Sequence, residues 1–228
     1  VYNGKKEVFE FLVAGRKLQA TGNHKFLALS KTGQQINQNG QSWQMNWKSL
    51  NELNEGDFIA IPKKIPEETN WSIELPKLKE YKRQKWRNKL ITPLHPNPNL
   101  MWLLGIIIGD GNIHFPKEGM CHINIALPLT DSAREPAINA VKELFDYDVT
   151  TKDKTSFSIY SKELGVWLNE IGIIGKAHEK RIPGWVYSLP EKLRLSLIAG
   201  ILDSDGYIEQ KQGTMSVELC NEKLIEDI

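Results

Sequence analysis

The sequence predicts an α+β protein in which a small all-β segment precedes a larger mixed segment. Residues 1–62 contain short apolar runs separated by clusters of turn residues, a pattern typical of strands. From residue 99 onward, runs with helical spacing alternate with short strand-like runs. A nine-residue pattern occurs twice in this second part, about 95 residues apart. We therefore expect a mixed domain with a weak internal repeat.

The predicted organisation has three parts. Residues 1–62 form the small β domain, residues 63–98 a basic linker broken by prolines, and residues 99–228 the mixed domain, which we expect to be incomplete at its C-terminal end. Residues 63–89 carry 9 basic and 4 acidic side chains. This stretch is interpreted either as an arm that contacts phosphates or as a solvated helix face. Residues 90–228 carry 13 basic and 19 acidic side chains, which argues against a simple electrostatic DNA binder.

Composition excludes several classes of protein. The hydrophobic content of 40% is ordinary for a globular chain. Cys121 and Cys220 lie far apart, in predicted strands, and neither belongs to a CxxC pair. We therefore expect neither a zinc site nor a disulfide scaffold, and we predict a cytoplasmic location. The longest apolar run, residues 101–108, is far shorter than the roughly 20 residues that cross a bilayer.

The mixed segment is predicted to contain both helices and strands. Helices are expected at about 99–109, 131–145, 162–171 and 191–203, with a further helix starting after Asn221, which is a good N-cap. Strands are expected at 121–127, at 156–160, near Tyr207 and at 215–219.

The nine-residue pattern occupies residues 103–111 and again residues 198–206. Each copy is an apolar helix with glycine at its third position, Gly105 and Gly200. A glycine inside a helix costs about 1 kcal/mol relative to alanine. Small residues let two helix backbones approach closely, which offsets this cost only if the helices pack together. We therefore expect a helix–helix interface at these two glycines.

Each copy ends in Asp-Gly: Asp110 with Gly111, and Asp205 with Gly206. We expect the two glycines to take the left-handed position that ends a helix. The aspartates then lie at helix C-termini, where the macrodipole disfavours an anion, and two neighbouring carboxylates repel each other further. Bound Mg²⁺ relieves both problems, and a metal held by two acids suits phosphodiester hydrolysis. The alternative is that each Asp-Gly pair only forms a helix-ending turn.

These two lines resemble the LAGLIDADG homing endonucleases, whose name spells the nine-residue motif. The resemblance implies that Asp110 and Asp205 are catalytic and bind the metal, helped by the main-chain carbonyl of Gly109 or Ser204. It also implies Mg²⁺ as the cofactor, duplex DNA as the substrate, and a domain of two pseudo-symmetric halves, of which the second is truncated here. The first copy departs from the name at its sixth position, where Ile108 stands.

Residues 175–185 read Gly-Lys-Ala-His-Glu-Lys-Arg-Ile-Pro-Gly-Trp and resemble the Lys-x-Ile-Pro segment of intein-type members of that family. The resemblance implies that Lys180 is a catalytic residue. A cation at this place polarises the attacking water or stabilises the pentavalent phosphate. The alternative is that Lys180 is one lysine among several in a basic loop.

Residues 15–29 and 56–62 look like the Hint domain of inteins, with Thr21 and His24 as its Thr-x-x-His element. In protein splicing an imidazole protonates the departing amide nitrogen, and a hydroxyl steadies the oxyanion. The resemblance implies this supporting role for Thr21 and His24. The nucleophilic first residue and the closing His-Asn pair are missing from the sequence, so we expect no splicing by this segment.

We interpret the chain as a segment of an intein with an inserted homing endonuclease. Its expected activity is Mg²⁺-dependent, site-specific double-strand DNA cleavage, coupled in the full protein to splicing. The expected partners are duplex DNA and the host extein protein in cis, with the chain itself a monomer. Two alternatives stay open: a truncated remnant that binds DNA without cutting it, and a splicing element with an inert endonuclease.

Overall fold

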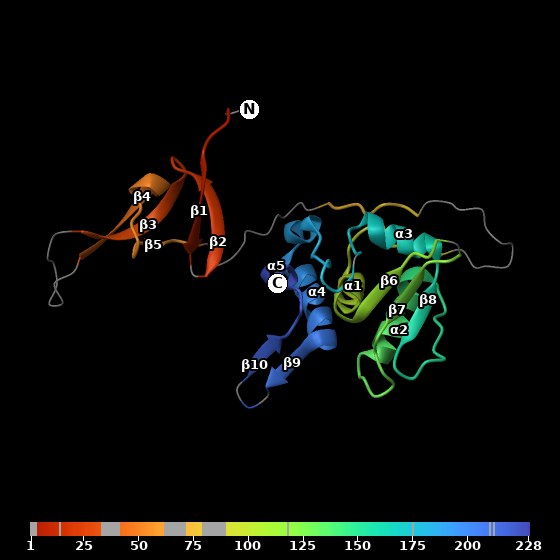
Figure 1. Cartoon of the computed structure of the whole chain (residues 1–228). Helices are drawn as coiled ribbons and strands as arrows, with labels where there is room; N and C mark the ends of the chain where they lie inside the picture. Colours follow the sequence, from red (N-terminus) through yellow and green to blue (C-terminus); the bar gives the residue numbers. More distant parts are fainter. Residues whose placement is uncertain are drawn as a thin grey trace. The chain divides into compact units, whose positions relative to one another are not determined.

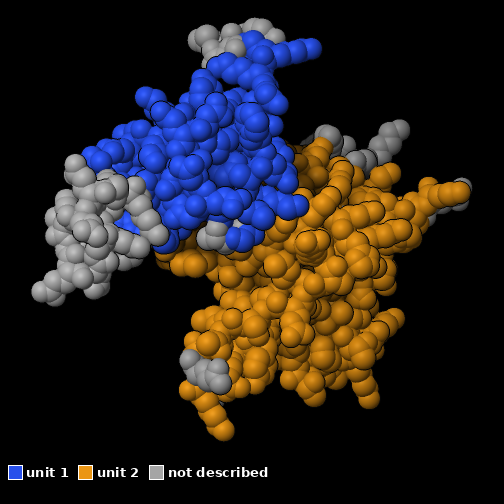
Figure 2. Space-filling view, turned by 60° about the vertical axis from the view of Figure 1, so that its left-hand side comes forward, with its two compact units in different colours: residues 1–66 blue, residues 67–228 orange. Residues whose placement is uncertain are grey.

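The computed structural model describes residues 4–13, 15–32, 42–61, 72–78, 90–117, 119–174, 176–209, 211 and 213–228. Over these residues the chain is α+β, with small sheets and five α-helices, which confirms the predicted class at this level. The chain divides into two compact units, residues 1–66 and residues 67–228, which Figure 2 colours separately. The finer predicted boundaries at residues 62 and 98 stay predictions.

The described residues of unit 1 form strands and one short 3-10 helix. Strands β1 (Val8–Val13) and β2 (Arg16–Thr21) form an antiparallel hairpin. Strands β3 (Lys25–Thr32), β4 (Ser42–Ser49) and β5 (Phe58–Ile59) form a second antiparallel sheet in the order β4-β3-β5, with η1 (Leu50–Glu52) after β4. The sequence also predicts turn clusters at residues 31–33 and 38–40. Residues 31–32 are the end of β3, and residues 33 and 38–40 lie outside the described residues.

Unit 2 is built on helices α1 (Pro98–Asp110) and α4 (Glu191–Asp205). Strands β6 (Gly111–His114), β7 (His122–Ile125) and β8 (Phe157–Tyr160) form an antiparallel sheet in that order. Strands β9 (Gly206–Glu209) and β10 (Thr214–Val217) form a hairpin after α4. The remaining elements are α2 (Arg134–Phe145), α3 (Lys162–Glu170), η2 (Gly184–Ser188) and α5 (Glu222–Asp227) (Figure 1).

The order of elements repeats within unit 2. A helix runs directly into a strand and then a second antiparallel strand, first as α1-β6-β7 and again as α4-β9-β10. The helices and strands expected in this segment are present, with ends that differ by at most three residues. The weak internal repeat read from the sequence therefore corresponds to a repeat of secondary structure.

Helix α1 runs through the core of unit 2. Its N-cap, Asn97, accepts a hydrogen bond from the Leu100 amide at 3.0 Å. Pro98 fits the first turn because its missing N–H would have no helical partner there. Eight residues of α1 are buried. Because apolar side chains surround the helix on all sides, it is covered by other elements and does not lie on the surface.

The three-stranded sheet has one apolar and one polar face. Ile113, Ile123 and Ile159 lie in one register row. Side chains alternate between faces along a strand, so this row shares a face and joins the hydrophobic core. Helices α2 and α3 add Phe145 and Trp167 to that core, with ring centroids 5.8 Å apart in an edge-to-face arrangement.

Two predictions about local backbone are wrong. Gly111 and Gly206 are not left-handed: their φ angles are −82° and −94°, with extended ψ, because each helix continues directly into a strand. Glycine is needed there for space, since an added Cβ would lie 2.8 Å from the Cα of Ile107 or 2.6 Å from that of Leu202. In addition, both cysteines are free and lie outside strands, Cys121 directly before β7 and Cys220 three residues after β10.

Parts of the predicted linker pack on unit 2. Leu75 and Leu90 belong to its core, and the indole Nε1 of Trp167 donates to the Pro76 carbonyl at 2.7 Å. Of the basic side chains between residues 77 and 89, only Lys77 is within the described residues, so both interpretations of that stretch stay open. None of the described helices combines the length and apolar character needed to span a bilayer.

Glycine substitutions test the contact between α1 and α4. An added Cβ on Gly105 would lie 2.9 Å from the Cα of Gly200, and one on Gly200 would lie 3.0 Å from the Cα of Gly105. Because the obstacle is backbone, Gly105→Ala and Gly200→Ala should each lower the free energy of unfolding by about 3 kcal/mol, measured by urea denaturation. Gly184→Ala is the control, since its Cβ meets nothing within 4 Å. Equal stability of all three variants would contradict the proposed close packing.

Candidate functional site

The two motif aspartates lie at the C-terminal ends of α1 and α4, which pack side by side (Figure 1). A Cβ built on Gly109 would contact the Ser204 side chain and lie 2.9 Å from Oδ2 of Asp205. The end of α1 therefore faces the end of α4. The charge of Asp205 also acts on Asp110, where it contributes to a raised pKa. The structure thus brings Asp110, Asp205, Gly109 and Ser204 together, whereas their metal-binding and catalytic roles stay predictions.

The site disfavours negative charge. Burial raises the pKa of Asp110 to about 6, and the charges of Asp205 and Asp131 contribute to the shift. Burial also raises the pKa of Asp205 above its usual range. Both groups are half-buried. Two such carboxylates are poorly solvated and repel each other, so the place between them favours a cation.

Lys180 reaches this site from the loop that precedes η2. Its Nζ donates a hydrogen bond to the main-chain carbonyl of Gly109 at 2.8 Å. Burial lowers the pKa of Lys180, whereas the charges of Asp205 and Asp110 act in the opposite direction. The prediction that this lysine lies beside the two aspartates is therefore met in its geometry, while its catalytic role stays a prediction.

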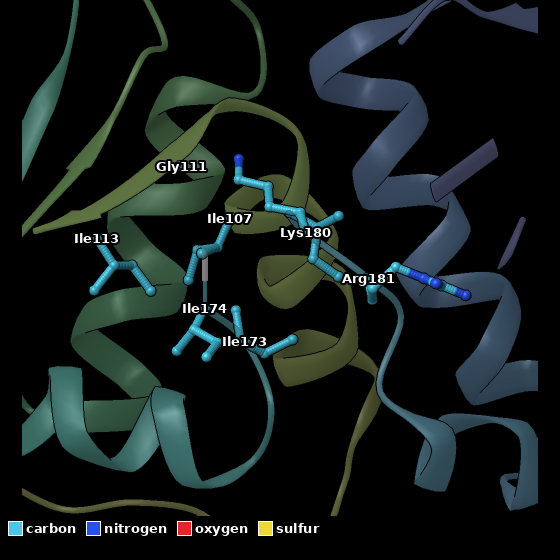
Figure 3. Close-up of a pocket in the computed structure, with 8 residues that line it drawn as sticks. Ile107, Gly111, Ile113, Ile173, Ile174, Lys180 and Arg181 are labelled. Carbon is cyan, nitrogen blue, oxygen red and sulfur yellow. The ribbon is translucent and has the colours of Figure 1, made fainter. Parts of the chain in front are cut away.

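A small pocket lies beside the lysine (Figure 3). Its lining is formed by Ile107, Ile108, Gly111, Ile113, Ile173, Ile174, Lys180 and Arg181. In Figure 3, Lys180 and Arg181 leave the loop in opposite directions. Lys180 extends toward the end of α1, and Arg181 pairs with Asp227 of α5. Most of the lining is aliphatic, which accounts for the desolvation of the lysine.

Ser204 has a local role in addition to its place beside Gly109. Its hydroxyl donates to the carbonyl oxygens of Gly200 and Ile201 within its own helix, at 3.1 and 3.0 Å. The carbonyl of Gly109 accepts from Lys180. A carbonyl oxygen has two lone pairs, so this bond leaves Gly109 able to contact a metal as well.

The two residues predicted to support splicing lie together in unit 1. The His24 amide donates to the Thr21 carbonyl at 2.9 Å. The Thr21 hydroxyl donates to the Asn23 side chain at 2.8 Å, and the His24 ring lies 4.9 Å from that of Phe26. His24 is exposed. These contacts are those of an ordinary turn between β2 and β3.

The sequence interpretation missed three features of the site. Asp131 acts on the pKa of Asp110. The indole Nε1 of Trp102 in α1 donates to Oδ2 of Asp203 in α4 at 2.7 Å, which links the two helices. Asn221 binds the loop that carries Lys180. Of these, only Asp203 carried a hint in the sequence, since it is the sixth residue of the second motif copy.

The donors present suit Mg²⁺ better than a softer metal. Among the described residues there is no cluster of three or more His, Cys, Asp or Glu side chains that could hold a metal. A pair of carboxylates with one main-chain carbonyl oxygen leaves most coordination positions to water or phosphate. Mg²⁺ tolerates this arrangement because it keeps several waters and is bound through one or two carboxylates.

Three proteins illustrate what the chain is similar to. It is 34% identical over its whole length to an iron-sulfur cluster assembly SufBD family protein of Mycobacterium leprae, of which it covers 26%. Over 63% of the chain it is 29% identical to 13% of a glutamine–fructose-6-phosphate aminotransferase of Methanocaldococcus jannaschii. Over 87% of the chain it is 24% identical to 18% of a replicative DNA helicase DnaB of Rhodothermus marinus. No protein-family model matches.

The chain thus spans about a quarter or less of the length of these relatives. The comparison contradicts the predicted membership of the intein and LAGLIDADG endonuclease families. The whole-chain match is to a protein named for iron-sulfur cluster assembly, and none of the three names describes an intein or an endonuclease. The interpretation as a site-specific double-strand endonuclease coupled to splicing is therefore wrong. The splicing roles of Thr21 and His24 are withdrawn with it.

The motif has a physical explanation that does not require that family. Glycine at the third position lets α1 and α4 approach, as Gly105 and Gly200 show. Glycine at the ninth position gives room for the direct junction between helix and strand at Gly111 and Gly206. Any pair of helices that cross this closely and continue directly into strands would need glycine at the same positions.

The raised pKa of Asp110 predicts how stability depends on pH. Its folded-state value of about 6 exceeds the ordinary 3.8, so the folded state binds the proton more tightly. The contribution of Asp110 to the free energy of unfolding is complete when the pH is below its pKa in the unfolded chain. It is lost as the pH rises through its pKa in the folded protein. Without metal, Asp110→Asn should therefore increase the free energy of unfolding at neutral pH by about 1 kcal/mol, after allowance for solvent screening.

Thermal unfolding in EDTA and in Mg²⁺ measures this effect. Mg²⁺ should raise the melting temperature of the wild type and leave Asp110→Asn unchanged, because a ligand stabilises only the state that binds it. Glu135→Gln, an exposed acid of α2, is the control. If Asp110→Asn is less stable than the wild type at neutral pH without metal, the electrostatic description of the site is wrong.

Proposed function

We propose that unit 2 is a Mg²⁺-dependent hydrolase of phosphate esters whose site is formed by Asp110, Asp205 and Lys180. The observation that carries this proposal is the pairing of two half-buried carboxylates with raised pKa values at the ends of packed helices, beside a half-buried lysine. Bound Mg²⁺ would supply Lewis-acid polarisation of a phosphoryl oxygen and a more acidic water.

Each residue has a distinct part in the proposed chemistry. Asp110 and Asp205 would hold the cation in their ionised forms, which cancels their mutual repulsion. Lys180, fixed by the Gly109 carbonyl at 2.8 Å, would place a positive charge where negative charge grows on the phosphate. The aliphatic pocket beside Lys180 limits the access of water to the lysine stem and strengthens this charge interaction.

The comparisons support an activity that belongs to the segment itself. The chain resembles parts of proteins with three different names, and it covers only 13% to 26% of each. A segment shared among proteins named for different activities need not carry out any of those named activities. We therefore infer that it is a module with its own site.

Duplex DNA is the phosphodiester polymer that we propose as a partner. The polar face of the β6-β7-β8 sheet has two register rows, Asn112-Asn124-Ser158 and His114-His122-Tyr160. The His122 and Tyr160 rings are stacked with centroids 4.7 Å apart. Amides, imidazoles and a phenol on an antiparallel sheet are groups that can hydrogen-bond to base edges and phosphates.

Substitution of the three site residues tests the hydrolase proposal. Asp110→Asn, Asp205→Asn and Lys180→Met should each lower the Mg²⁺-dependent rate of hydrolysis of bis(p-nitrophenyl) phosphate by about 100-fold or more. Each substitution removes a group that would stabilise charge in the transition state of the reacting phosphate. Glu135→Gln should keep the wild-type rate. Retained Mg²⁺-dependent turnover in both aspartate variants would exclude this site as the source of activity.

The name of the whole-chain relative favours a second candidate, a part in iron-sulfur cluster assembly. Cys220 is the exposed cysteine, whereas Cys121 is buried and burial raises its pKa to about 11, which makes it a poor ligand as a thiol. Reconstitution with ferrous iron and sulfide, followed by visible absorption, separates the two candidates. A cluster that forms in the wild type and not in Cys220→Ser would favour this second function over the hydrolase.

A further inference from the structure

The loop that carries Lys180 is tied to the start of α5 by one buried amide. The Asn221 side chain is 5% exposed. Its Nδ2 donates to the carbonyl oxygens of Ala177 and Lys180, at 3.0 and 2.7 Å. Its Oδ1 accepts from the Leu224 amide at 3.2 Å, which caps α5. Asn221 therefore joins the main chain of the lysine loop to the helix.

A second tie binds the residues that directly follow the lysine. Asp227, near the end of α5, accepts from Nε and Nη2 of Arg181, each at 2.6 Å, and from the Ile182 amide at 3.0 Å. Burial works to raise the pKa of Asp227, but the hydrogen bonds from Arg181 and Ile182 hold it below its usual range. A bidentate arginine–carboxylate pair of this kind restricts both the distance and the relative orientation of the two side chains.

The two ties act on three consecutive residues of the loop. Asn221 holds the carbonyl of Lys180 itself, and Asp227 holds the next two residues through the Arg181 side chain and the Ile182 amide. A lysine side chain is long and flexible, so its Nζ stays at one place only if its main chain is fixed. The 2.8 Å bond from Nζ to the Gly109 carbonyl shows the result of that fixation.

We propose that Asn221 and Asp227 are positioning residues that hold Lys180 against the carboxylate pair, so that α5 and its N-cap help to form the site. This inference rests on the proposed hydrolase function and deepens it. Three titratable groups act on Lys180: Asp110 from α1, Asp205 from α4 and Cys220 from the segment before α5. None of the three belongs to the lysine loop, so a movement of that loop changes its distance from all of them.

The first test is Asn221→Ser. Serine is neutral and still caps α5, but its short hydroxyl cannot donate to both loop carbonyls. We expect kcat for Mg²⁺-dependent hydrolysis of bis(p-nitrophenyl) phosphate to fall about tenfold or more, since a displacement of about 1 Å can cost up to 100-fold. KM and the affinity for Mg²⁺ should change little, because both carboxylates are untouched. Lys223→Gln, an exposed residue of the same helix, is the control.

A double-mutant comparison separates positioning from general loss of structure. In a Lys180→Met background, Asn221→Ser should cause no further fall in kcat, because the group that it positions is gone. A fall of the same size in both backgrounds would overturn the proposal. Asp227→Asn keeps an acceptor for the Ile182 amide and weakens the Arg181 pair, so it serves in the same comparison if Asn221→Ser does not fold.

A spectroscopic measurement keeps the inference independent of turnover. The position of Lys180 is followed by the NMR chemical shift of the ¹³C-methylated lysines in the full chain, with its resonance assigned by its loss in Lys180→Met. Release of the loop should break the hydrogen bond from Nζ to the Gly109 carbonyl and move the Lys180 resonance toward those of the exposed lysines. Absence of wild-type turnover would reject the hydrolase proposal alone. A Lys180 resonance that moves in neither Asn221→Ser nor Asp227→Asn would reject the positioning role.

Discussion

The site depends on the close approach of α1 and α4. At Gly105 and Gly200 the two helix backbones come so near that an added Cβ on either glycine would reach the Cα of the other. This crossing lies in the core of unit 2, where Leu104 and Ile201 are fully buried. Because the helices end a short distance beyond the crossing, their last residues must also lie close together. The same contact therefore builds the core and pairs Asp110 with Asp205.

The pairing is unfavourable in electrostatic terms and is tolerated because the core imposes it. Two half-buried carboxylates at the negative ends of helix dipoles oppose folding when both are ionised. Lys180 offsets part of that charge from a loop that belongs to neither helix. Local features that reduce stability and survive in a well-packed protein are found mainly at functional sites. The ends of α1 and α4 are such a place.

The nine-residue motif predicts how the two helices pack more directly than it predicts the family to which the chain belongs. Its glycines are explained by the helix crossing and by the two helix-to-strand junctions. Its aspartates follow at the helix ends. The family named from this pattern is contradicted by the comparisons, whereas the helix interface, the repeated order of elements and the pairing of the acids are present in the structure. A short pattern can thus predict a contact correctly and a lineage wrongly, because packing constraints select its residues.

Much of the fold could be predicted because local rules decide it. The helical period, the caps at Asn97 and Asn221 and the alternation within strands act over a few residues, so the sequence by itself determined the α+β class and most element spans. The interface at Gly105 and Gly200 was also predictable, since an interior glycine needs a reason. The tertiary structure alone decided the extended backbone at Gly111 and the bond from Asn221 to the Lys180 carbonyl, 41 residues away. Such contacts depend on how whole elements pack, and no local pattern encodes that.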